Sequence, residues 1–365
     1  MTLRLAINGF GRVGRCVLRA LHERHQQLGS RLQVVAINEL AGLDTIAYLT
    51  RYDSTHGRFP GRVELPRDGR ECLLVDGREI SVSHQQSLTD LPWAEHSIDL
   101  VLECTGTFAQ RSIAQQHISA GAKAVLFSQP AEADIDATVV YGINHQQLSG
   151  EHKIISAASC TTNCVVPAIK ALHDALGVEA GVITTIHSAM NDQPVLDSYH
   201  HTDLRKTRAA FQSIIPVETG LARGIDRVLP ELRGRFEAQA MRVPTQNVSA
   251  IDLSVQVKND TSSEAVNAIL RAASEGSLRH ILGFTEEPLA SCDFNHDAHS
   301  GVVDASQTRV GGQRLVKVLL WFDNEWGYAN RMLDVVEFWK GKNLKRLNSV
   351  RPGNGQAEQR QHDIP

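Results

Sequence analysis

The chain has 365 residues, of which 42% are hydrophobic and 21% charged, and its formal net charge at pH 7 is −4. The length suggests about two domains, and the composition is ordinary for a globular protein. The weak net charge gives no reason to expect nucleic acid or an anionic membrane as a partner. No apolar run reaches the roughly 18 residues of a membrane span, and no signal-peptide pattern precedes the first strand. We therefore expect a cytoplasmic protein.

Six cysteines are present, an even number that could form disulfides. A long chain without a signal peptide needs no such cross-links, so we expect reduced thiols. Only Cys160 and Cys164 lie close together, and no second pair of cysteines or histidines follows at zinc-binding spacing. The sequence therefore predicts no metal site.

The first half alternates short apolar strands with helical patterns. Leu3–Asn8 is predicted to be a buried strand, Gly9–Gly14 a glycine-rich turn, Arg15–His25 a helix and Leu32–Ile37 the next strand. This order is a βαβ unit, which requires a parallel sheet. One further helix, Ile113–Ala120, and several strands follow: Leu73–Val75, Ile98–Glu103, Ala124–Phe127, Ala137–Val140 and Lys153–Ser156. We predict a Rossmann-type, doubly wound α/β sheet over residues 1–155.

Residues 156–326 have a different pattern. A helix is predicted from Cys160 to Leu176, with Gly177 as its stop, and Ser262–Glu275 is an amphipathic helix. The expected strands are Val182–Ile186, Phe236–Val243, Val248–Val257 and Leu315–Phe322. Strands with few helices between them favour an α+β catalytic domain with a mixed or antiparallel sheet. The polar stretch Ser188–Pro216 is expected to be a long functional loop.

The end of the chain is predicted to contain one more helix and a tail. Met332–Lys340 has a helical pattern, within a C-terminal helix over about residues 327–345 that we expect to pack back on the first domain. Residues 348–365 contain few apolar side chains and are expected to be a mobile tail.

A cofactor site is predicted at the first βαβ unit. Gly9, Gly11 and Gly14 form a Gly-x-Gly-x-x-Gly pattern after a strand and before a helix, where backbone N–H groups can hold a pyrophosphate. Glu39 ends the next strand, where a carboxylate accepts hydrogen bonds from the ribose hydroxyls and repels a 2′-phosphate. The expected cofactor is therefore NAD. A glycine turn beside a solvated Glu39 is the alternative interpretation.

A nucleophile is predicted at Cys160, in the run Ser159–Cys164. A cysteine at a helix N-terminus has its thiolate stabilised by backbone N–H groups, so we expect a lowered pKa. Cys164 lies one turn further on and is expected to be a buried apolar residue. His187, at the end of a strand, is a possible base, although spacing alone does not separate it from a structural histidine.

Six blocks resemble the glyceraldehyde-3-phosphate dehydrogenase superfamily, in order, over about residues 1–340. They are Ile7–Gly14, Tyr52–Gly57, Ser159–Cys164, Thr184–His187, Arg242–Thr245 and Trp321–Gly327. The resemblance implies that the Cys160 thiolate attacks an aldehyde and that His187 activates the thiol. His187 then accepts the hydroxyl proton while hydride leaves for the nicotinamide. A thioester remains, which water or phosphate releases. For His56, within the second block, a surface role is expected.

The resemblance also assigns binding roles. Arg12 and Val13 match positions whose backbone meets the pyrophosphate, and Gln86 loosely matches a position near the adenine. Ser128 and Asn324 match positions near the nicotinamide. The positions that hold phosphate groups of a sugar phosphate match Ser159, Thr161, Lys206, Thr219, Gly220 and Arg242. For each hydroxyl, a turn or cap role is an equal alternative. A homotetramer is also implied, with the loop at Ser188–Pro216 near subunit contacts.

Three departures concern the substrate and cofactor sites. Met190 stands where phosphorylating members place a threonine, and a thioether cannot donate a hydrogen bond. Lys206 replaces an arginine and loses its bidentate fork, and Gln86 replaces an arginine near the adenine end. The runs Ile186–Met190, Ala36–Leu40, Asp293–Asp297 and Ala329–Met332 resemble the bacterial erythrose-4-phosphate dehydrogenase branch.

That branch implies oxidation of D-erythrose 4-phosphate to 4-phosphoerythronate, with water as acyl acceptor and a product that feeds pyridoxal 5′-phosphate synthesis. The alternatives are a phosphorylating glyceraldehyde-3-phosphate dehydrogenase and a non-catalytic NAD-sensing protein. The presence of both Cys160 and His187 argues against the last of these.

Overall fold

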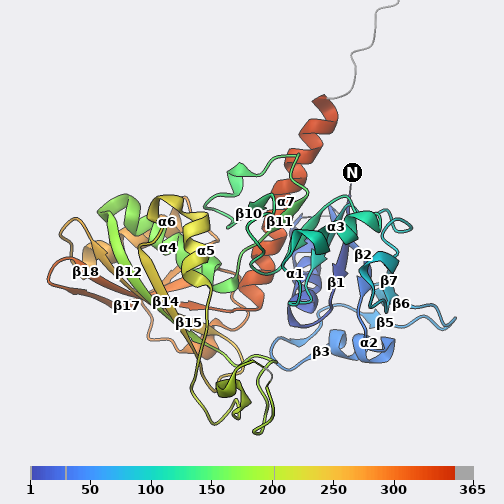
Figure 1. The fold of residues 1–365 in the computed structure, drawn as a ribbon, viewed down its shortest axis with the longest axis horizontal. Coiled ribbons are helices and arrows are strands. Elements are labelled where there is room, and N and C mark those ends of the chain that lie inside the picture. Colours follow the sequence, from blue (N-terminus) through green and yellow to red (C-terminus); the bar gives the residue numbers. More distant parts are fainter. Residues whose placement is uncertain (1, 29–30, 201, 350–365) are drawn as a thin grey trace, which may run out of the picture.

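The computed structural model describes residues 2–28, 31–200 and 202–349. Two large sheets lie side by side along the long axis of the molecule, and the C-terminal helix α7 (Trp326–Ser349) runs between them (Figure 1). None of the helices in this part of the chain is long and apolar enough to cross a membrane.

The first sheet has nine strands in the order β10-β11-β9-β8-β1-β2-β7-β6-β5. Seven of them pair in parallel: β1 (Leu3–Asn8), β2 (Leu32–Asn38), β7 (Arg78–Ser83), β8 (Leu100–Glu103), β9 (Val125–Phe127), β10 (Ala137–Thr138) and β11 (Ile154–Ser156). β5 (Val63–Glu64) and β6 (Cys72–Val75) add an antiparallel edge. The chain proceeds in opposite directions from β1, to β2 and later to β8, so the carboxyl end of β1 is the switch point where such folds bind ligands.

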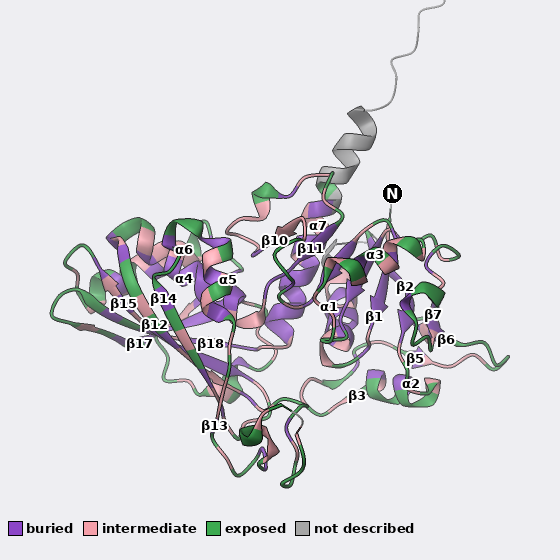
Figure 2. Ribbon diagram, in the orientation of Figure 1, coloured by how far each residue is buried: buried purple, intermediate pink, exposed green. Residues whose placement is uncertain are grey.

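Helices cover this sheet and account for its buried strands. They are α1 (Arg12–Leu28), α2 (Leu43–Arg51) and α3 (Arg111–Ser119), and a small hairpin of β3 (Tyr52–Asp53) and β4 (Gly57–Arg58) follows α2. All four residues of β8 are buried, as expected for a parallel strand with both faces covered. The neighbouring strand β1 is largely in the purple of buried residues in Figure 2. Helix α7 shares a hydrophobic core with α1 and β1, through side chains such as Met332 and Val336.

The second sheet has seven strands in the order β13-β14-β12-β15-β18-β17-β16. They are β12 (Val178–His187), β13 (Ile215–Val217), β14 (Phe236–Arg242), β15 (Ser249–Val257), β16 (Leu282–Thr285), β17 (Gly301–Gly311) and β18 (Leu315–Phe322). Helices α4 (Cys160–Leu176), α5 (Leu221–Val228) and α6 (Ser263–Glu275) pack together on one face of this sheet (Figure 1). β12–β14 and β16–β17 are parallel and the other pairs antiparallel, which confirms the predicted mixed sheet.

Several predicted boundaries are wrong for identifiable reasons. α1 begins at Arg12 rather than Arg15, because the turn needs only Gly9 and Gly11 and the third glycine already lies in the helix. α7 begins at Trp326, six residues before the helical pattern at Met332 but within one residue of the start at about 327 that was expected for the C-terminal helix. The Asp323 carboxylate accepts a hydrogen bond from the Trp326 N–H at 2.8 Å and caps the helix. Of the predicted tail, residues 348 and 349 are helical, and residues 350–365 lie outside the described residues.

Sequence patterns did not predict α2 and α5, the strands β3, β4, β5, β7, β13, β16 and β17, or the short 3-10 helices. The latter are Leu88–Asp90, His145–Gln147, Leu204–Thr207, Pro230–Leu232 and Ser291–Phe294. The long loop at Ser188–Pro216 is irregular apart from one of these turns and the first residues of β13. The loop connects β12 to the edge of the second sheet, next to the end of the strand that carries His187.

Candidate active site

The glycine turn between β1 and α1 forms the floor of a cleft. Gly9 has φ +84°, and a Cβ there would lie 2.6 Å from the Thr105 nitrogen. A Cβ at Gly14 would lie 2.5 Å from the Gly9 carbonyl oxygen, so the helix and the turn pack in direct contact. At Gly11 a Cβ would meet nothing within 4 Å, which leaves the backbone open to the cleft. Each glycine thus does what a dinucleotide-binding turn requires.

The cleft has a volume of about 350 Å³ and is lined by Gly9, Gly11, Glu39, Gln86 and Thr105 among others. The carboxylate of Glu39 accepts hydrogen bonds at 2.8 Å from the N–H groups of Phe10 and Leu40, which hold it at the cleft. α1 has no acidic residue in its first turn, so its N-terminus is free to attract an anion. These residues fit NAD: the turn and the start of α1, where Arg12 and Val13 lie, would hold the pyrophosphate, and Glu39 the ribose.

A buried carboxylate, which sequence reasoning did not identify, supports the cleft from below. Glu103 accepts hydrogen bonds from Asn8 Nδ2 at 2.6 Å, His117 Nε2 at 3.0 Å and the Thr105 N–H at 2.9 Å. Asn8 ends β1, and Thr105 follows β8 in contact with Gly9. Glu103 therefore ties together the two strand ends on either side of the switch point.

Cys160 and His187 are brought together at the junction of the two sheets. Cys160 is the first residue of α4, which Ser159 caps by accepting a hydrogen bond from the Thr162 N–H at 3.1 Å. His187 ends β12, and its Nδ1 donates to the Ser188 carbonyl at 2.8 Å. Since Nδ1 carries the proton, Nε2 is unprotonated and has a free lone pair. Nε2 lies 4.0 Å from Cys160 Sγ.

The protonation states of this pair differ from the sequence-based expectation. Burial raises the pKa of the Cys160 thiol to about 11, and the N–H groups of Thr161 and Cys160 only partly offset it. Burial also lowers the pKa of His187. The predicted net lowering of the Cys160 pKa by the helix N-terminus is therefore wrong for this structure, because desolvation is the larger effect. At neutral pH the pair consists of a thiol and a neutral imidazole.

Asn324 lies beside this pair in a fixed orientation. Its Oδ1 accepts hydrogen bonds from Ser188 Oγ at 3.0 Å and Ser249 Oγ at 2.8 Å, so its amide NH₂ remains available as a donor. Ser128 is almost completely buried near the end of β9, and its N–H donates to the Glu103 carbonyl at 3.0 Å. Both residues thus lie at strand ends that face the junction between the sheets.

The hydroxyl-bearing candidates lie at the starts of two helices. Ser159 Oγ and Thr161 Oγ1 are 2.9 Å apart at the start of α4. Thr219 Oγ1 accepts from the Leu221 N–H at 3.3 Å, and Gly220 is the N-cap of α5. A Cβ at Gly224 would lie 2.8 Å from Thr162 Oγ1, so the first turns of α4 and α5 are in contact. Two helix N-termini therefore adjoin, which favours binding of an anion.

Asp192, absent from the predicted site, links the two cationic candidates. Its carboxylate accepts a close hydrogen bond from Arg242 and another from Lys206 Nζ at 3.0 Å. Although burial acts to raise it, the pKa of Asp192 is lowered by these two bonds. Met190 is half-exposed nearby and hydrogen-bonds through its backbone, donating its N–H to Gln193 Oε1 and accepting from the Gln193 N–H. A phosphate at Arg242 would compete with a carboxylate already in place.

The side chain of Arg12 has a role that the sequence did not indicate. Its guanidinium donates to Asp53 and to Glu325, which lies between Asn324 and α7. His56 Nε2 lies 3.2 Å from the same Glu325 carboxylate. The expected surface role for His56 is wrong, because its side chain is only 1% exposed. The YDSTHG block therefore helps to anchor the residues next to Asn324.

Two family profiles match the chain. The profile described as "Glyceraldehyde 3-phosphate dehydrogenase, NAD binding domain" matches residues 3–111. The profile described as "Glyceraldehyde 3-phosphate dehydrogenase, C-terminal domain" matches residues 159–324. The first includes the glycine turn and Glu39, which agrees with NAD as cofactor. The second begins one residue before Cys160 and ends at Asn324.

Proposed function

The chain belongs to the glyceraldehyde-3-phosphate dehydrogenase family and is an NAD-dependent oxidoreductase, and on that basis we propose that it oxidises D-erythrose 4-phosphate to 4-phosphoerythronate. The observation that carries a covalent mechanism is the 4.0 Å separation of Cys160 Sγ and His187 Nε2 beside the cofactor cleft. The unprotonated Nε2 of His187 is the nearby base that can remove the thiol proton of Cys160, and loss of that proton makes the sulfur a nucleophile.

In the proposed reaction His187 Nε2 accepts the Cys160 proton, and the sulfur bonds to the aldehyde carbon. The Cys160 backbone N–H and the protonated imidazole stabilise the resulting oxyanion, which takes the proton back to give a thiohemiacetal. NAD held by the glycine turn and Glu39 would supply the acceptor for the hydride of the thiohemiacetal. His187 accepts the hydroxyl proton, and a thioester remains on Cys160. Water then adds to the thioester, the C–S bond breaks, and the acid leaves with the thiol restored.

Water is proposed as the acyl acceptor because of Asp192. Its carboxylate forms ion pairs with both Arg242 and Lys206, the two cationic side chains that would otherwise bind an inorganic phosphate in this site. Met190 adds no hydrogen-bond donor from its side chain. Inorganic phosphate would therefore meet a site with a negative charge already present, whereas water meets no such barrier. The acid produced is proposed to supply the synthesis of pyridoxal 5′-phosphate.

NADH formation measured with erythrose 4-phosphate and with glyceraldehyde 3-phosphate, each with and without inorganic phosphate, tests this proposal. We expect a higher kcat/KM for the tetrose and no requirement for phosphate. Preference for the triose together with a strong phosphate requirement would favour the phosphorylating enzyme instead. The absence of turnover with any aldehyde phosphate, with NAD binding retained, would favour an NAD-sensing protein.

A single substitution should change the acyl acceptor. In Asp192→Asn the carboxylate charge is lost and Arg242 becomes available, so phosphate should accelerate turnover by about tenfold, equivalent to about 1.4 kcal/mol of transition-state binding. The matched control is Asp197→Asn, in the same loop, where the carboxylate pairs with Arg208 on the surface. An equal lack of phosphate response in both variants would contradict the role given to Asp192.

We also propose a cytoplasmic homotetramer. All six cysteines are free thiols in the structure. The loop at Ser188–Pro216 exposes large apolar side chains, namely Val195, Leu196, Tyr199, Leu204, Phe211 and Ile214. Such a group on one loop is typical of a protein interface. Sedimentation equilibrium should give four subunits for the wild type and smaller species for Leu196→Glu.

A further inference from the structure

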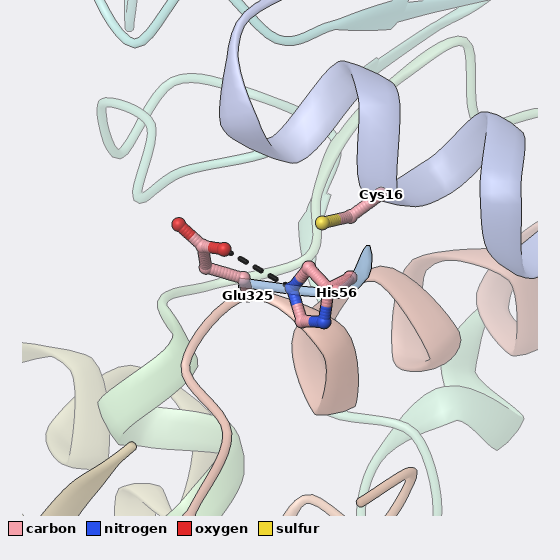
Figure 3. Close-up of side chains that lie close together, drawn as sticks. All are labelled: Cys16, His56 and Glu325. Carbon is pink, nitrogen blue, oxygen red and sulfur yellow. Dashed lines mark hydrogen bonds and ion pairs between the residues drawn. The ribbon is translucent and has the colours of Figure 1, made fainter. Parts of the chain in front are cut away.

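A second cysteine–histidine cluster lies behind the glycine turn, outside the proposed active site. Cys16 of α1, His56 from the β3–β4 hairpin and Glu325 next to α7 place their sulfur, ring nitrogen and carboxylate oxygen within 4.8 Å of one another. Figure 3 shows the Cys16 sulfur directed towards the space between the other two side chains. We propose that this cluster binds a zinc-like divalent transition metal.

The hydrogen-bond chain of the two histidines points to a cation at this place. His296 Nε2 lies 3.1 Å from a Glu23 carboxylate oxygen, so that nitrogen carries the proton. In a neutral His296, Nδ1 is then an acceptor, and the proton in its 3.1 Å contact belongs to His56 Nδ1. His56 Nε2 is then unprotonated, and its lone pair faces Glu325 Oε2 at 3.2 Å. Two acceptors at this distance require a cation between them.

A metal ion satisfies this arrangement with the ligands that are present. Thiolate, imidazole and carboxylate are all zinc ligands, and bonds of about 2.0–2.3 Å in a tetrahedron separate ligand atoms by about 3.3–3.8 Å. The histidine and carboxylate atoms already have nearly this spacing, and the sulfur needs to move by about 1 Å or less. His56 Nδ1 donating to His296 is the outer contact that usually orients a metal-binding imidazole. A water molecule would complete the coordination.

The surrounding charges favour a further cation. The groups packed around the cluster include four carboxylates, of Glu23, Asp53, Asp323 and Glu325, and three guanidinium groups, of Arg12, Arg15 and Arg19. Arg12 donates to both oxygens of Glu325, from Nε to Oε1 at 2.8 Å and from Nη2 to Oε2 in a close contact. A metal bound to Oε2 would share that oxygen with Arg12, while the bond to Oε1 is retained. Because carboxylates outnumber guanidinium groups, the surroundings of the cluster are net negative. A divalent cation bound to one thiolate adds a net charge of +1, which offsets this negative charge.

The competing occupant is a proton, which would make one histidine an imidazolium. The position of Cys16 favours the metal, because a proton between His56 and Glu325 needs no sulfur beside it. Burial raises the pKa of the Cys16 thiol well above its usual value, so the thiolate forms only with a bound metal. Binding therefore forms an S–metal bond and releases the thiol proton to solvent, with a second proton released if the histidine pair was protonated.

Cobalt binding is the test, since Co²⁺ takes zinc sites and a thiolate ligand gives an intense near-ultraviolet charge-transfer band. The experiment uses the Cys160→Ala protein, which removes the thiol of the active site as a second Co²⁺ ligand. We expect one Co²⁺ per chain with a thiolate band, and one or two protons released per ion in weakly buffered solution. In the same background Cys16→Ala should remove the band and weaken binding at least 100-fold.

Cys72→Ala is the matched control, since Cys72 is also a buried free thiol but lies on β6, away from the cluster. His56→Asn should weaken binding as Cys16→Ala does, while NAD binding and circular dichroism report that each variant is folded. A thiolate band that persists in Cys16→Ala would overturn the proposal. So would the absence of any cobalt–thiolate band in the folded parent protein, which would assign the cation between His56 and Glu325 as a proton.

Discussion

Cys160 and Cys16 each have a histidine nearby, and the two sites differ in what the histidine does with its second nitrogen. His187 donates from Nδ1 to a backbone carbonyl, so its free Nε2 faces Cys160. His56 has both nitrogens engaged, with His296 and with Glu325. The first arrangement can accept and return a proton without disturbing the fold. The second is a network that any proton transfer must rearrange.

The surroundings reinforce this difference. Cys160 is only half-buried and begins a helix whose backbone N–H groups stabilise its thiolate. Cys16 is 2% exposed and is the fifth residue of α1, just past the first turn whose N–H groups are free. A cysteine and a histidine in proximity therefore do not define a reactive site. A reactive site is defined instead by a cysteine at the start of a helix and a histidine nitrogen with a free lone pair. We therefore expect Cys160 to be more reactive than Cys16.

The largest expected effect is on turnover. Cys160→Ser should reduce kcat by roughly four orders of magnitude or more, because the proposed reaction has no other nucleophile. Cys16→Ala in the metal-free protein should change kcat by less than about threefold, because Cys16 contacts neither cleft nor substrate. Steady-state NADH formation, with NAD binding by fluorescence quenching as the folding control, measures both. A similar loss in the two variants would remove the distinction drawn between the sites.

A smaller effect is expected on the alkylation of Cys160 by iodoacetamide. Its pKa of about 11 means that the thiolate fraction, and with it the alkylation rate, should rise tenfold per pH unit between pH 7 and 10. The pKa is raised, so the neutral thiol is the stable form below pH 11 and the rate falls as pH falls. Mass spectrometry of labelled peptides should show Cys16 reacting more slowly than Cys160 throughout. A plateau in the Cys160 rate near pH 7 would indicate a preformed thiolate.

Much of the cofactor cleft was predictable because its determinants are local. The sequence pattern at strand and helix ends is enough to identify Gly9, Gly11, Gly14 and Cys160 as site residues. The Arg12–Glu325 pair joins residues 313 positions apart, and no local pattern connects them. Asp192 and Lys206 both lie in the predicted loop, but Arg242, at the end of β14, meets Asp192 only after β12 and β14 are paired. Side-chain bridges between distant segments are what the sequence could not supply.

The same limit applies to burial. His56 lies in the turn of the short β3–β4 hairpin and has polar neighbours, which is why a surface position was expected. However, Trp326 of α7 and His296 both pack against its ring. A helix from the far end of the chain thus buries a segment that looks exposed in the sequence. The cysteine pKa was mispredicted for a related reason, since the helix N-terminus is local and the desolvation of Sγ comes from the packing of both sheets.

The smallest expected effect concerns stability. His56→Asn should lower the free energy of unfolding by about 1–3 kcal/mol, because the contacts that join the His56 ring to His296 and to the largely buried Glu325 carboxylate are lost. His84 is a matched control, since it also pairs with a carboxylate, Glu71 at 3.3 Å, but in a more exposed position. His84→Asn should cost less than about 1 kcal/mol. Urea unfolding of both variants gives the comparison, and equal midpoints would mean that the His56 network contributes no more than a surface pair.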